Sequence, residues 1–329
     1  MSVDLSSLNQ TPRLLFSIPL RPIQGHRFQP TGFPGLGASV FQTQRGRCLL
    51  VESAQSMANW LERVVWDDAR NAPVAALAGL SHVTVTRNDR FLTDTMLEAH
   101  RLNSPYLLEG KGSPFMALLK SDLGGLGQGP VNRRKLAEVL LRYDAGSLIH
   151  GVFLAKSELA GGRLRVARAL SAFIEADGVE SADSGGVKND AINPSGKAKD
   201  GFGNVPFARS EFTAERITLY VNLDLALLRG YGLDEDAVRL LVLVALYKVA
   251  RLTEGGLRLR TACDLVRDGE GPIVADAPRG WVLPEGAALE ADLAEAIQKN
   301  AHRMEQRSFA YEGDLGADEG DDDGSAAPQ

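Results

Sequence analysis

Residues 216–225 (RITLYVNLDL) alternate between apolar and polar side chains, and this pattern constrains the fold more than any other segment. A period of two indicates a strand with one buried face. The next segment, from Asp234 to about Thr253, is apolar nearly all round, which predicts a central buried helix capped by Asp234. Residues 257–262 (LRLRTA) return to a strand pattern. A strand, a helix and a strand, with the helix on one face of the sheet, predict an α+β fold.

Further short elements are separated by glycine-rich segments. Ser53 is expected to cap a helix, because the apolar residues from Met57 to Val65 recur at helical spacing. Residues 147–155 (SLIHGVFLA) predict a buried strand, whereas residues 163–176 fit either a strand or a helix. Other strands are expected at residues 14–20 and 48–51, and other helices at residues 91–102, 133–143 and 289–304.

Residues 184–209 form a long glycine-rich segment without a periodic pattern of its own, and such segments are usually functional or disordered. Cations match phosphates, aromatic faces match bases, and glycine lets the backbone approach a ligand. Single-stranded nucleic acid is therefore the first partner to expect. The residues of this segment expected to bind RNA are Lys188, Asn189, Lys197, Lys199, Phe202, Asn204, Phe207 and Arg209.

Within this segment, residues 200–207 (DGFGNVPF) match five of the seven defined positions of the RNA-binding strand motif of RRM domains. Asp200 and Asn204 depart from the motif, and Pro206 is unfavourable in a central strand. Three interpretations stay open: a literal RRM strand, a glycine-aromatic loop that contacts RNA, and a structural turn anchored by Phe202 and Phe207.

Two other sets of residues suit the same ligand. In the loop at residues 25–37 (GHRFQPTGFPGLG), His26, Arg27 and Phe28 are expected to bind RNA, with packing of an ordered loop on the domain as the alternative. Arg258 and Arg260 lie two apart on one strand face, a spacing that suits a phosphate clamp. Ion pairs with surface acids are the alternative for these two arginines.

The formal net charge of −6 is unevenly distributed. Seven of the 42 acidic residues lie in the tail at residues 312–329, which leaves 35 acids against 36 bases in the body. A nearly neutral body can still hold a basic groove if its charges are segregated. The tail is expected to be disordered and to aid solubility. A tail that competes with nucleic acid for the protein's own cations is the alternative.

The two cysteines, Cys48 and Cys263, are too far apart for a disulfide framework or a zinc spacing. We expect both to be small buried hydrophobes in a reducing cytoplasm. The N-terminus lacks the charged and apolar regions of a signal peptide. Residues 238–250, the most apolar stretch, are too short to span a bilayer, so no membrane partner is expected.

The sequence has no phosphate loop, no dinucleotide fingerprint and no zinc-protease motif. None of the five histidines has metal-ligand spacing to another, and His150 in an apolar segment is expected to be a satisfied core residue. Asp190 and Asp200 are expected to form turns, with metal binding or activation of a 2′-hydroxyl as the alternative. We therefore expect no catalytic residue, no bound metal and no cofactor.

Nine strings occur in order between Gly25 and Leu265: HRFQPTGFPGLG, LLVESAQSMANWLE, EAHRLNSPY, LIHGVFLA, RALSAFIEADGV, SGGVKND, PSGKAKDGFGNVPF, YVNLDLALLRGYGL and EGGLRLRTACDL. Together they closely resemble the RAMP-type backbone subunit (Cas-seven group) of type I-U, or type I-G, CRISPR effector complexes. The resemblance implies a modified ferredoxin-like or RRM-like palm. Residues 1–311 would form a single RNA-binding domain with inserted loops at residues 25–47 and 184–209, followed by the tail at residues 312–329.

The resemblance also implies a function. Copies of the subunit would line up head to tail along a CRISPR guide RNA, hold it for pairing with target DNA, and contact other effector subunits. Such backbones do not cut nucleic acid, and a separate helicase-nuclease degrades the target. Two alternatives stay open: a metal-dependent RNA endonuclease acting through Asp190 or Asp200, and an assembly protein whose loops contact only neighbouring subunits.

Overall fold

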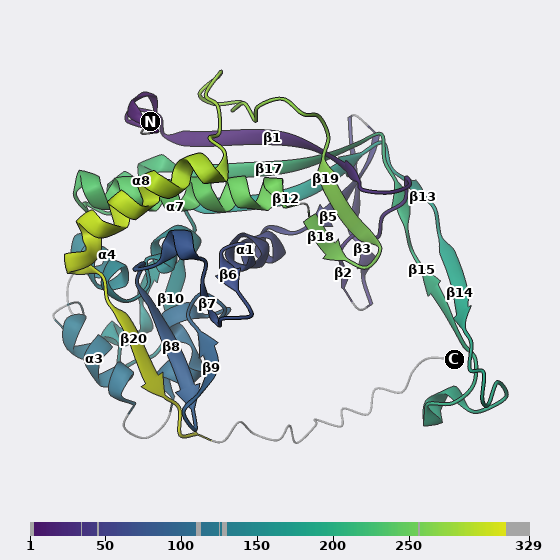
Figure 1. Ribbon diagram of the computed structural model, residues 1–329, viewed down its shortest axis with the longest axis horizontal. Coiled ribbons are helices and arrows are strands. Elements are labelled where there is room, and N and C mark those ends of the chain that lie inside the picture. The colour runs from purple at the N-terminus through teal and green to yellow at the C-terminus, as the bar shows by residue number, and fades with distance from the viewer. Residues whose placement is uncertain are drawn as a thin grey trace.

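In the computed structural model, the protein is built on a seven-stranded antiparallel sheet (Figure 1). The structure describes residues 3–313 apart from residues 34, 45, 110–112, 125, 127–129 and 256. The predicted acidic tail lies outside the described residues from residue 314 onward. Across the sheet the strands are β18 (Leu257–Arg260), β19 (Cys263–Arg267), β1 (Arg13–Pro22), β17 (Arg216–Asp224), β12 (Leu170–Asp177), β5 (Gly46–Glu52) and β4 (Val40–Thr43).

Strand β17 lies at the centre of the sheet and pairs with β1 on one side and β12 on the other. Its apolar positions are buried, as the alternation in the sequence predicts, and Thr218 is buried with them. Strand β1 alternates in the same way, so one face of each strand points into the core. The buried apolar residues of the two strands are Ile217, Leu219, Val221, Leu223, Leu14, Phe16, Ile18 and Leu20.

Helix α7 (Glu235–Glu254) is the central buried helix that its composition predicts. Asp234 caps it by accepting a hydrogen bond from the backbone N–H of Ala237 at 3.0 Å. Helices α1 (Ala54–Arg63) and α7 lie on the same side of the sheet, and α8 (Gly286–Asn300) packs on α7 (Figure 1). Helices on one face of an antiparallel sheet confirm the α+β prediction. Among the described helices, none is long and apolar enough to cross a membrane.

A lobe of short elements extends from the helical side of the sheet (Figure 1). A small sheet contains β20 (Gln306–Ala310), β8 (His82–Arg87) and β9 (Arg90–Asp94). Its helices are α2 (Pro105–Leu108), α3 (Pro114–Asp122), α4 (Arg133–Tyr143) and α5 (Gly146–His150). A two-stranded ribbon pairs β10 (Val152–Leu154) with β11 (Leu164–Val166).

A second ribbon, β14 (Ser184–Lys188) with β15 (Val205–Arg209), projects from the opposite end of the sheet. The sheet, the lobe and this ribbon together form an arch (Figure 1). The remaining described elements are short. They are β2 (Gly32–Phe33), β3 (Gly37–Ala38), β6 (Trp66–Asp67), β7 (Ala72–Pro73), β13 (Glu180–Ser181), β16 (Phe212–Thr213), α6 (Leu225–Gly230) and single 3-10 turns at residues 6–8, 75–77, 101–103, 160–162, 198–200 and 301–303.

Two predicted elements are wrong. Residues 91–102 form strand β9 and a turn instead of a helix, because the Asp94 carboxylate accepts hydrogen bonds from the Met96 backbone and the Thr84 hydroxyl. Residues 147–155 begin as helix α5 and become strand β10 only after Gly151. Gly151 has a φ of 82°, and a side chain there would meet the Val166 carbonyl at 2.9 Å. The chain therefore turns sharply at this glycine.

The other elements agree with the sequence. Ser53 caps α1, α4 covers residues 133–143 as expected, and residues 163–176 resolve into the strands β11 and β12. Cys48 and Cys263 are free and buried, as expected of small apolar residues. Burial raises the pKa of the Cys263 thiol to about 12.

Candidate nucleic-acid interface

The segment at residues 184–209 is an ordered β-hairpin, not the unpatterned loop that the sequence suggested. Strands β14 and β15 pair in register from Ser184 opposite Arg209 to Lys188 opposite Val205. Gly186 explains how the ribbon accommodates a ring, because a Cβ at this position would meet the Phe207 ring at 2.9 Å. The glycine therefore lets the aromatic side chain lie across the partner strand.

The hairpin tip is organised by Asp190. The Asp190 carboxylate accepts hydrogen bonds from the backbone N–H groups of Ile192, Asn193 and Gly203 at 2.8–3.0 Å. These bonds lower the pKa of Asp190, in the order Asn193, Gly203 and Ile192. Asn204 adds a fourth bond by accepting from the Asp190 backbone N–H at 2.8 Å. The turn-forming role expected of Asp190 is confirmed.

The hairpin carries exposed cations and aromatic rings. Lys188, Lys197 and Lys199 are exposed, and none of them makes an ion pair or side-chain hydrogen bond within the described part of the chain. The rings of Phe202 and Phe207 are 55% and 44% exposed. The Arg209 guanidinium lies 5.2 Å from the centre of the Phe207 ring, a cation–π contact. Exposed cations and exposed aromatic rings, the groups suited to phosphates and to bases, therefore share one ribbon.

The RRM-like string at residues 200–207 does not form a strand of the central sheet. Its first half, with Asp200 at the end of a 3-10 turn, belongs to the hairpin tip, and its second half forms β15. Pro206 is tolerated there because β15 belongs to a two-stranded ribbon and not to a sheet interior. A literal RRM strand is therefore excluded, whereas contact between these exposed residues and RNA stays a prediction.

The loop at residues 25–37 is attached to the root of the hairpin. The backbones of Phe28 and Phe212 exchange two hydrogen bonds of 2.9 Å. Arg27 lies 3.3 Å from Glu211, whose carboxylate also accepts a hydrogen bond from the Ser184 hydroxyl at 2.9 Å. These contacts bring together two segments that the sequence could only place separately.

The structure corrects the role expected of Phe28. Its side chain is only 1% exposed and packs in the core, so its ring is closed to a base. Phe28 was expected to bind RNA with His26 and Arg27 because the three residues are adjacent in the sequence. His26 and Arg27 are indeed exposed, and they stay predicted RNA contacts.

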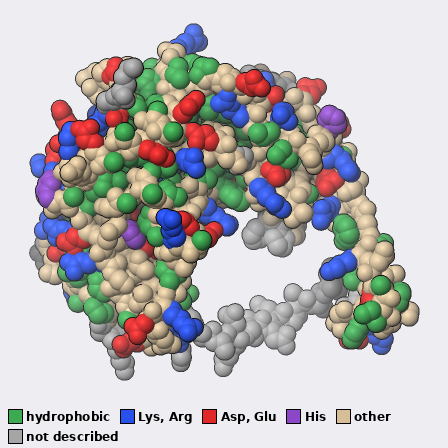
Figure 2. All heavy atoms as spheres, viewed as in Figure 1, with side chains coloured by type: hydrophobic (Ala, Val, Ile, Leu, Met, Phe, Trp, Pro, Cys, Tyr) green, Lys and Arg blue, Asp and Glu red, His purple; other side chains and the backbone are tan. Residues whose placement is uncertain are grey.

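A groove of about 500 Å³ lies where the loop, the hairpin root and β18 meet. We call it the hairpin groove. Gln29 and Thr31 line one side, Arg209 lines another, and Arg260 reaches it from the sheet. Figure 2 shows Lys and Arg side chains along the edge of the hairpin that faces the hollow of the arch. Cations and backbone groups from three separate segments therefore converge beside the hairpin.

The expected phosphate clamp of Arg258 and Arg260 does not form. Arg260 makes an ion pair with the buried Glu52 and donates to the Gln29 carbonyl at 2.9 Å. Arg258 is exposed and does not line the groove. An irregularity in the β18–β19 register falls between the two arginines, and such irregularities redirect side chains. Arg260 therefore holds the loop to the sheet through an ion pair, although its partner is a buried acid and not the surface acid that the alternative expected.

A group of polar residues in the lobe was not predicted from the sequence. Arg101, Glu62 and Asp144 form a buried ion-pair cluster, and Arg165 and Arg168 lie near it. The basic run at residues 163–168 (RLRVAR) was the available signal, but its secondary structure was ambiguous. The cluster itself joins residues far apart in the sequence, so no local pattern reports it. No group of three or more acidic, Cys or His residues suited to a metal ion was found in the described residues.

The chain belongs to the family described as CRISPR-associated protein GSU0053, whose model matches residues 14–181. This match confirms the resemblance to RAMP-type backbone subunits of CRISPR effectors that the sequence shows. The matched residues run from β1 to β13 and end before the hairpin.

Two solved structures are similar to this chain at low identity. One is titled "CRISPR RNA-guided surveillance complex, pre-nicking", with 13% identity, a TM-score of 0.41, and coverage of 78% of this chain and 73% of that chain. The other is the crystal structure of Thermofilum pendens Csc2, with 10% identity, a TM-score of 0.33, and coverage of 91% and 78%. No curated protein matches the chain.

Proposed function

We propose that this protein is a non-catalytic backbone subunit that binds a CRISPR guide RNA through its hairpin and hairpin groove. The observation that carries the proposal is the projecting β14–β15 ribbon, whose lysines have no described protein partner and whose aromatic rings are exposed. A guide of any sequence must be held by its phosphates and by stacking, so that its base edges stay free to pair with target DNA. The hairpin offers both kinds of contact.

We further infer that several copies bind one guide. A head-to-tail contact that does not close on itself gives an open filament, and such a filament lets many nearly neutral subunits share one RNA strand. In this proposal the antiparallel sheet corresponds to the modified ferredoxin-like palm of type I-U or type I-G backbones. Other effector subunits would complete the complex in the cytoplasm, and a separate helicase-nuclease would degrade the target.

The alternative of an RNA endonuclease acting through a loop aspartate has no support in the geometry of Asp190. Both of its carboxylate oxygens already accept backbone hydrogen bonds that hold the hairpin tip. Asp200 is exposed at the same tip. The proposed role for both residues is to shape the tip.

The test is the salt dependence of RNA binding. Changing Lys188, Lys197 and Lys199 together to Ala should weaken binding equally for unrelated RNA sequences. It should also reduce the slope of log K against log salt by about 2, since each phosphate contact to a single strand contributes about 0.7. The matched control changes three exposed cations of the lobe, Arg90→Ala, Lys120→Ala and Lys135→Ala.

The control variant loses the same charge and should keep the slope of the native protein. Equal slopes in the hairpin variant and the native protein would show that the hairpin does not contact phosphates. Purification of the native complex gives a second measurement, because a backbone subunit should carry RNA of uniform length.

A further inference from the structure

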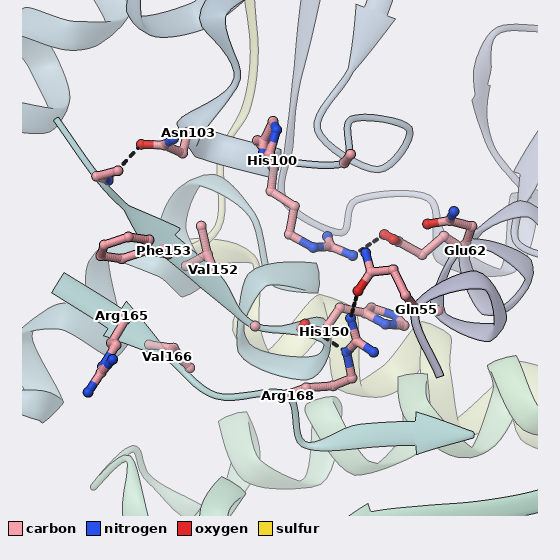
Figure 3. Close-up of a pocket in the computed structure, with 16 residues that line it drawn as sticks. Gln55, Glu62, His100, Asn103, His150, Val152, Phe153, Arg165, Val166 and Arg168 are labelled. Atoms are coloured by element: carbon pink, nitrogen blue, oxygen red, sulfur yellow. Dashed lines mark hydrogen bonds and ion pairs between the residues drawn. The ribbon is translucent and has the colours of Figure 1, made fainter. Parts of the chain in front are cut away.

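A second pocket, the lobe pocket, lies between α1, the 3-10 turn at residues 101–103 and the β10–β11 ribbon (Figure 3). Its volume is about 810 Å³, within the range of sites that bind small ligands. It shares no lining residue with the hairpin groove. A ligand bound here would therefore contact a different part of the molecule from the proposed RNA site.

The floor of the lobe pocket lies above a charged cluster. Arg101, Arg168 and Glu62 line the pocket, whereas Lys248 and Asp144 lie behind it against His150 and Arg101, so that three cations meet two carboxylates. Arg101 is 4% exposed and makes ion pairs with both carboxylates. Among the described residues, the hydrogen bonds of Arg168 go to neutral oxygen atoms, which are the carbonyls of residues 54 and 150 and the side chain of residue 55.

His150 is a hydrogen-bond donor without an acceptor at this floor. Its ring is 5% exposed, and its Nε2 lies 2.8 Å from the Lys248 ammonium. Burial, and then the charges of Lys248, Arg101 and Arg168, lower the pKa of His150 well below its usual value, so the ring is neutral. A neutral ring that accepts at Nε2 carries its proton on Nδ1. Nδ1 has no hydrogen-bond partner among the described residues.

The rim of the lobe pocket has an exposed ring beside an exposed cation. Phe153 on β10 is 54% exposed, although both of its neighbours in the strand are buried. Arg165 lies directly opposite it on β11, so the two side chains emerge on the same face of the ribbon. Arg165 is exposed and makes no ion pair or hydrogen bond through its side chain with any residue that the structure describes. Figure 3 shows Phe153 and Arg165 on the ribbon at the left of the view and Arg168 beside His150 to the right.

We propose that the lobe pocket binds a phosphorylated nucleotide. The base stacks on Phe153, and Arg165, directly opposite Phe153 in the ribbon, binds the phosphate at the rim. Asn59 and Asn103 at the wall supply amide groups suited to the edge of a base or to ribose hydroxyls. A purely structural charge cluster would need neither an exposed ring nor an unpaired arginine at its rim. The inference goes beyond the proposed function, because the lobe pocket shares no lining residue with the hairpin groove and lies apart from the hairpin.

The experiment is isothermal titration of nuclease-treated full-length protein with four probes: AMP, adenosine, ribose 5-phosphate and a 5′-phosphorylated RNA trinucleotide. We expect AMP or the trinucleotide to bind with one site per chain and adenosine to bind at least 10-fold more weakly. Saturable AMP binding assigns the pocket to a free nucleotide, whereas binding of the trinucleotide alone assigns it to a nucleotide of a strand.

Two exposed substitutions test the placement of the ligand. Phe153→Ala should weaken binding of the probe about 10-fold and leave ribose 5-phosphate unaffected, because stacking acts on the base. Arg165→Gln should weaken both the nucleotide probe and ribose 5-phosphate. Phe41→Ala on β4 is the matched control for the ring, since Phe41 is exposed and lines neither the lobe pocket nor the hairpin groove, and Arg90→Gln is the control for the cation.

Absence of binding by both AMP and the trinucleotide would overturn the inference. Binding that neither Phe153→Ala nor Arg165→Gln changes would also overturn it. Failure of the proposed hairpin function is distinguishable, because it appears as an unchanged salt slope in the variant lacking Lys188, Lys197 and Lys199. That variant should retain the native affinity for AMP or, if the trinucleotide alone binds, the part of trinucleotide binding that Phe153→Ala removes.

Discussion

Replacing Arg101 by Met should destabilise the protein by about 3–5 kcal/mol at pH 8, because removal of one partner leaves buried charges without compensation. The side chains of Glu62 and Asp144 are 11% and 0% exposed, so water cannot replace the guanidinium. Asp144 retains a hydrogen bond of 2.6 Å from the Ser147 hydroxyl. Because this bond remains, we expect the destabilisation to lie in the lower half of that range of about 3–5 kcal/mol.

The loss of stability caused by Arg101→Met should depend on pH. Burial raises the pKa of Glu62 in the native protein, and the charge of Arg101 opposes that rise. Without Arg101, the pKa of Glu62 in the folded variant rises further above its unfolded value. A carboxyl with a raised folded pKa binds more protons when folded, so stability falls as pH rises through that pKa. The difference in free energy of unfolding between the native protein and Arg101→Met should therefore be smaller at pH 5 than at pH 8 by about 1 kcal/mol or more, because one pKa unit corresponds to about 1.4 kcal/mol.

The assay is urea unfolding at pH 5 and pH 8, followed by circular dichroism. Arg90→Met is the control, because Arg90 is an exposed arginine of the lobe, and its free energy of unfolding should stay within about 0.5 kcal/mol of the native value. The double variant Arg101→Met with Glu62→Gln should be more stable than Arg101→Met alone. A loss at pH 8 no larger than that of Arg90→Met, or the same loss at both pH values, would refute the reasoning.

Three further predictions concern the core, the hairpin tip and the thiols. In urea unfolding, Phe28→Ala should lower the free energy of unfolding by about 3–5 kcal/mol, because Phe28 is buried in the core. Phe202→Ala should leave the free energy of unfolding unchanged. In an RNA titration, Phe202→Ala should weaken binding by about 1–3 kcal/mol. Asp190→Ala should speed hydrogen exchange at the backbone amides of the hairpin tip. In the presence of Mg²⁺, matched RNA should stay intact with both the native protein and this variant. Regular cleavage by the native protein that is lost in the variant would contradict the non-catalytic proposal. Cys263 should react with a thiol reagent at pH 8 only after unfolding, because a pKa of about 12 leaves almost no thiolate; rapid labelling of the folded protein would contradict its burial.

The centre of the fold was predictable from the sequence because its signals are local. Residues 216–224 alternate with a period of two, and Asp234 caps a helix whose apolar composition indicates burial on every side. Both patterns arise because burial in the core determines which residues of each element are apolar. The bounds of α4 at residues 133–143 follow in the same way from an amphipathic period.

The hairpin was not predictable as a ribbon, because both of its faces are exposed. A strand that buries neither face has no alternation for the sequence to reveal. Its composition did indicate cations and rings, and the structure shows these side chains exposed. The interior position of Phe28, by contrast, depends on pairing with Phe212, which lies far along the chain.

The candidate sites depend even more on distant residues. The hairpin groove combines the loop around Gln29 with Arg209 and Arg260, and the lobe pocket combines α1 with the ribbon that carries Phe153. Sequence reasoning identified individual residues with suitable chemistry. Their mutual placement required the order of the strands in the sheet.

The exposed hairpin has a thermodynamic consequence. A two-stranded ribbon alone is marginally stable in water, and the side chains of β14 and β15 are exposed or half-exposed along their whole length. The Asp190 bonds at the tip and the Glu211 contacts at the root reinforce it. Its backbone amides should therefore exchange with solvent by local opening, at a free energy well below that of global unfolding. A ligand that orders this ribbon would slow that exchange while leaving the amides of β17 and α7 unchanged.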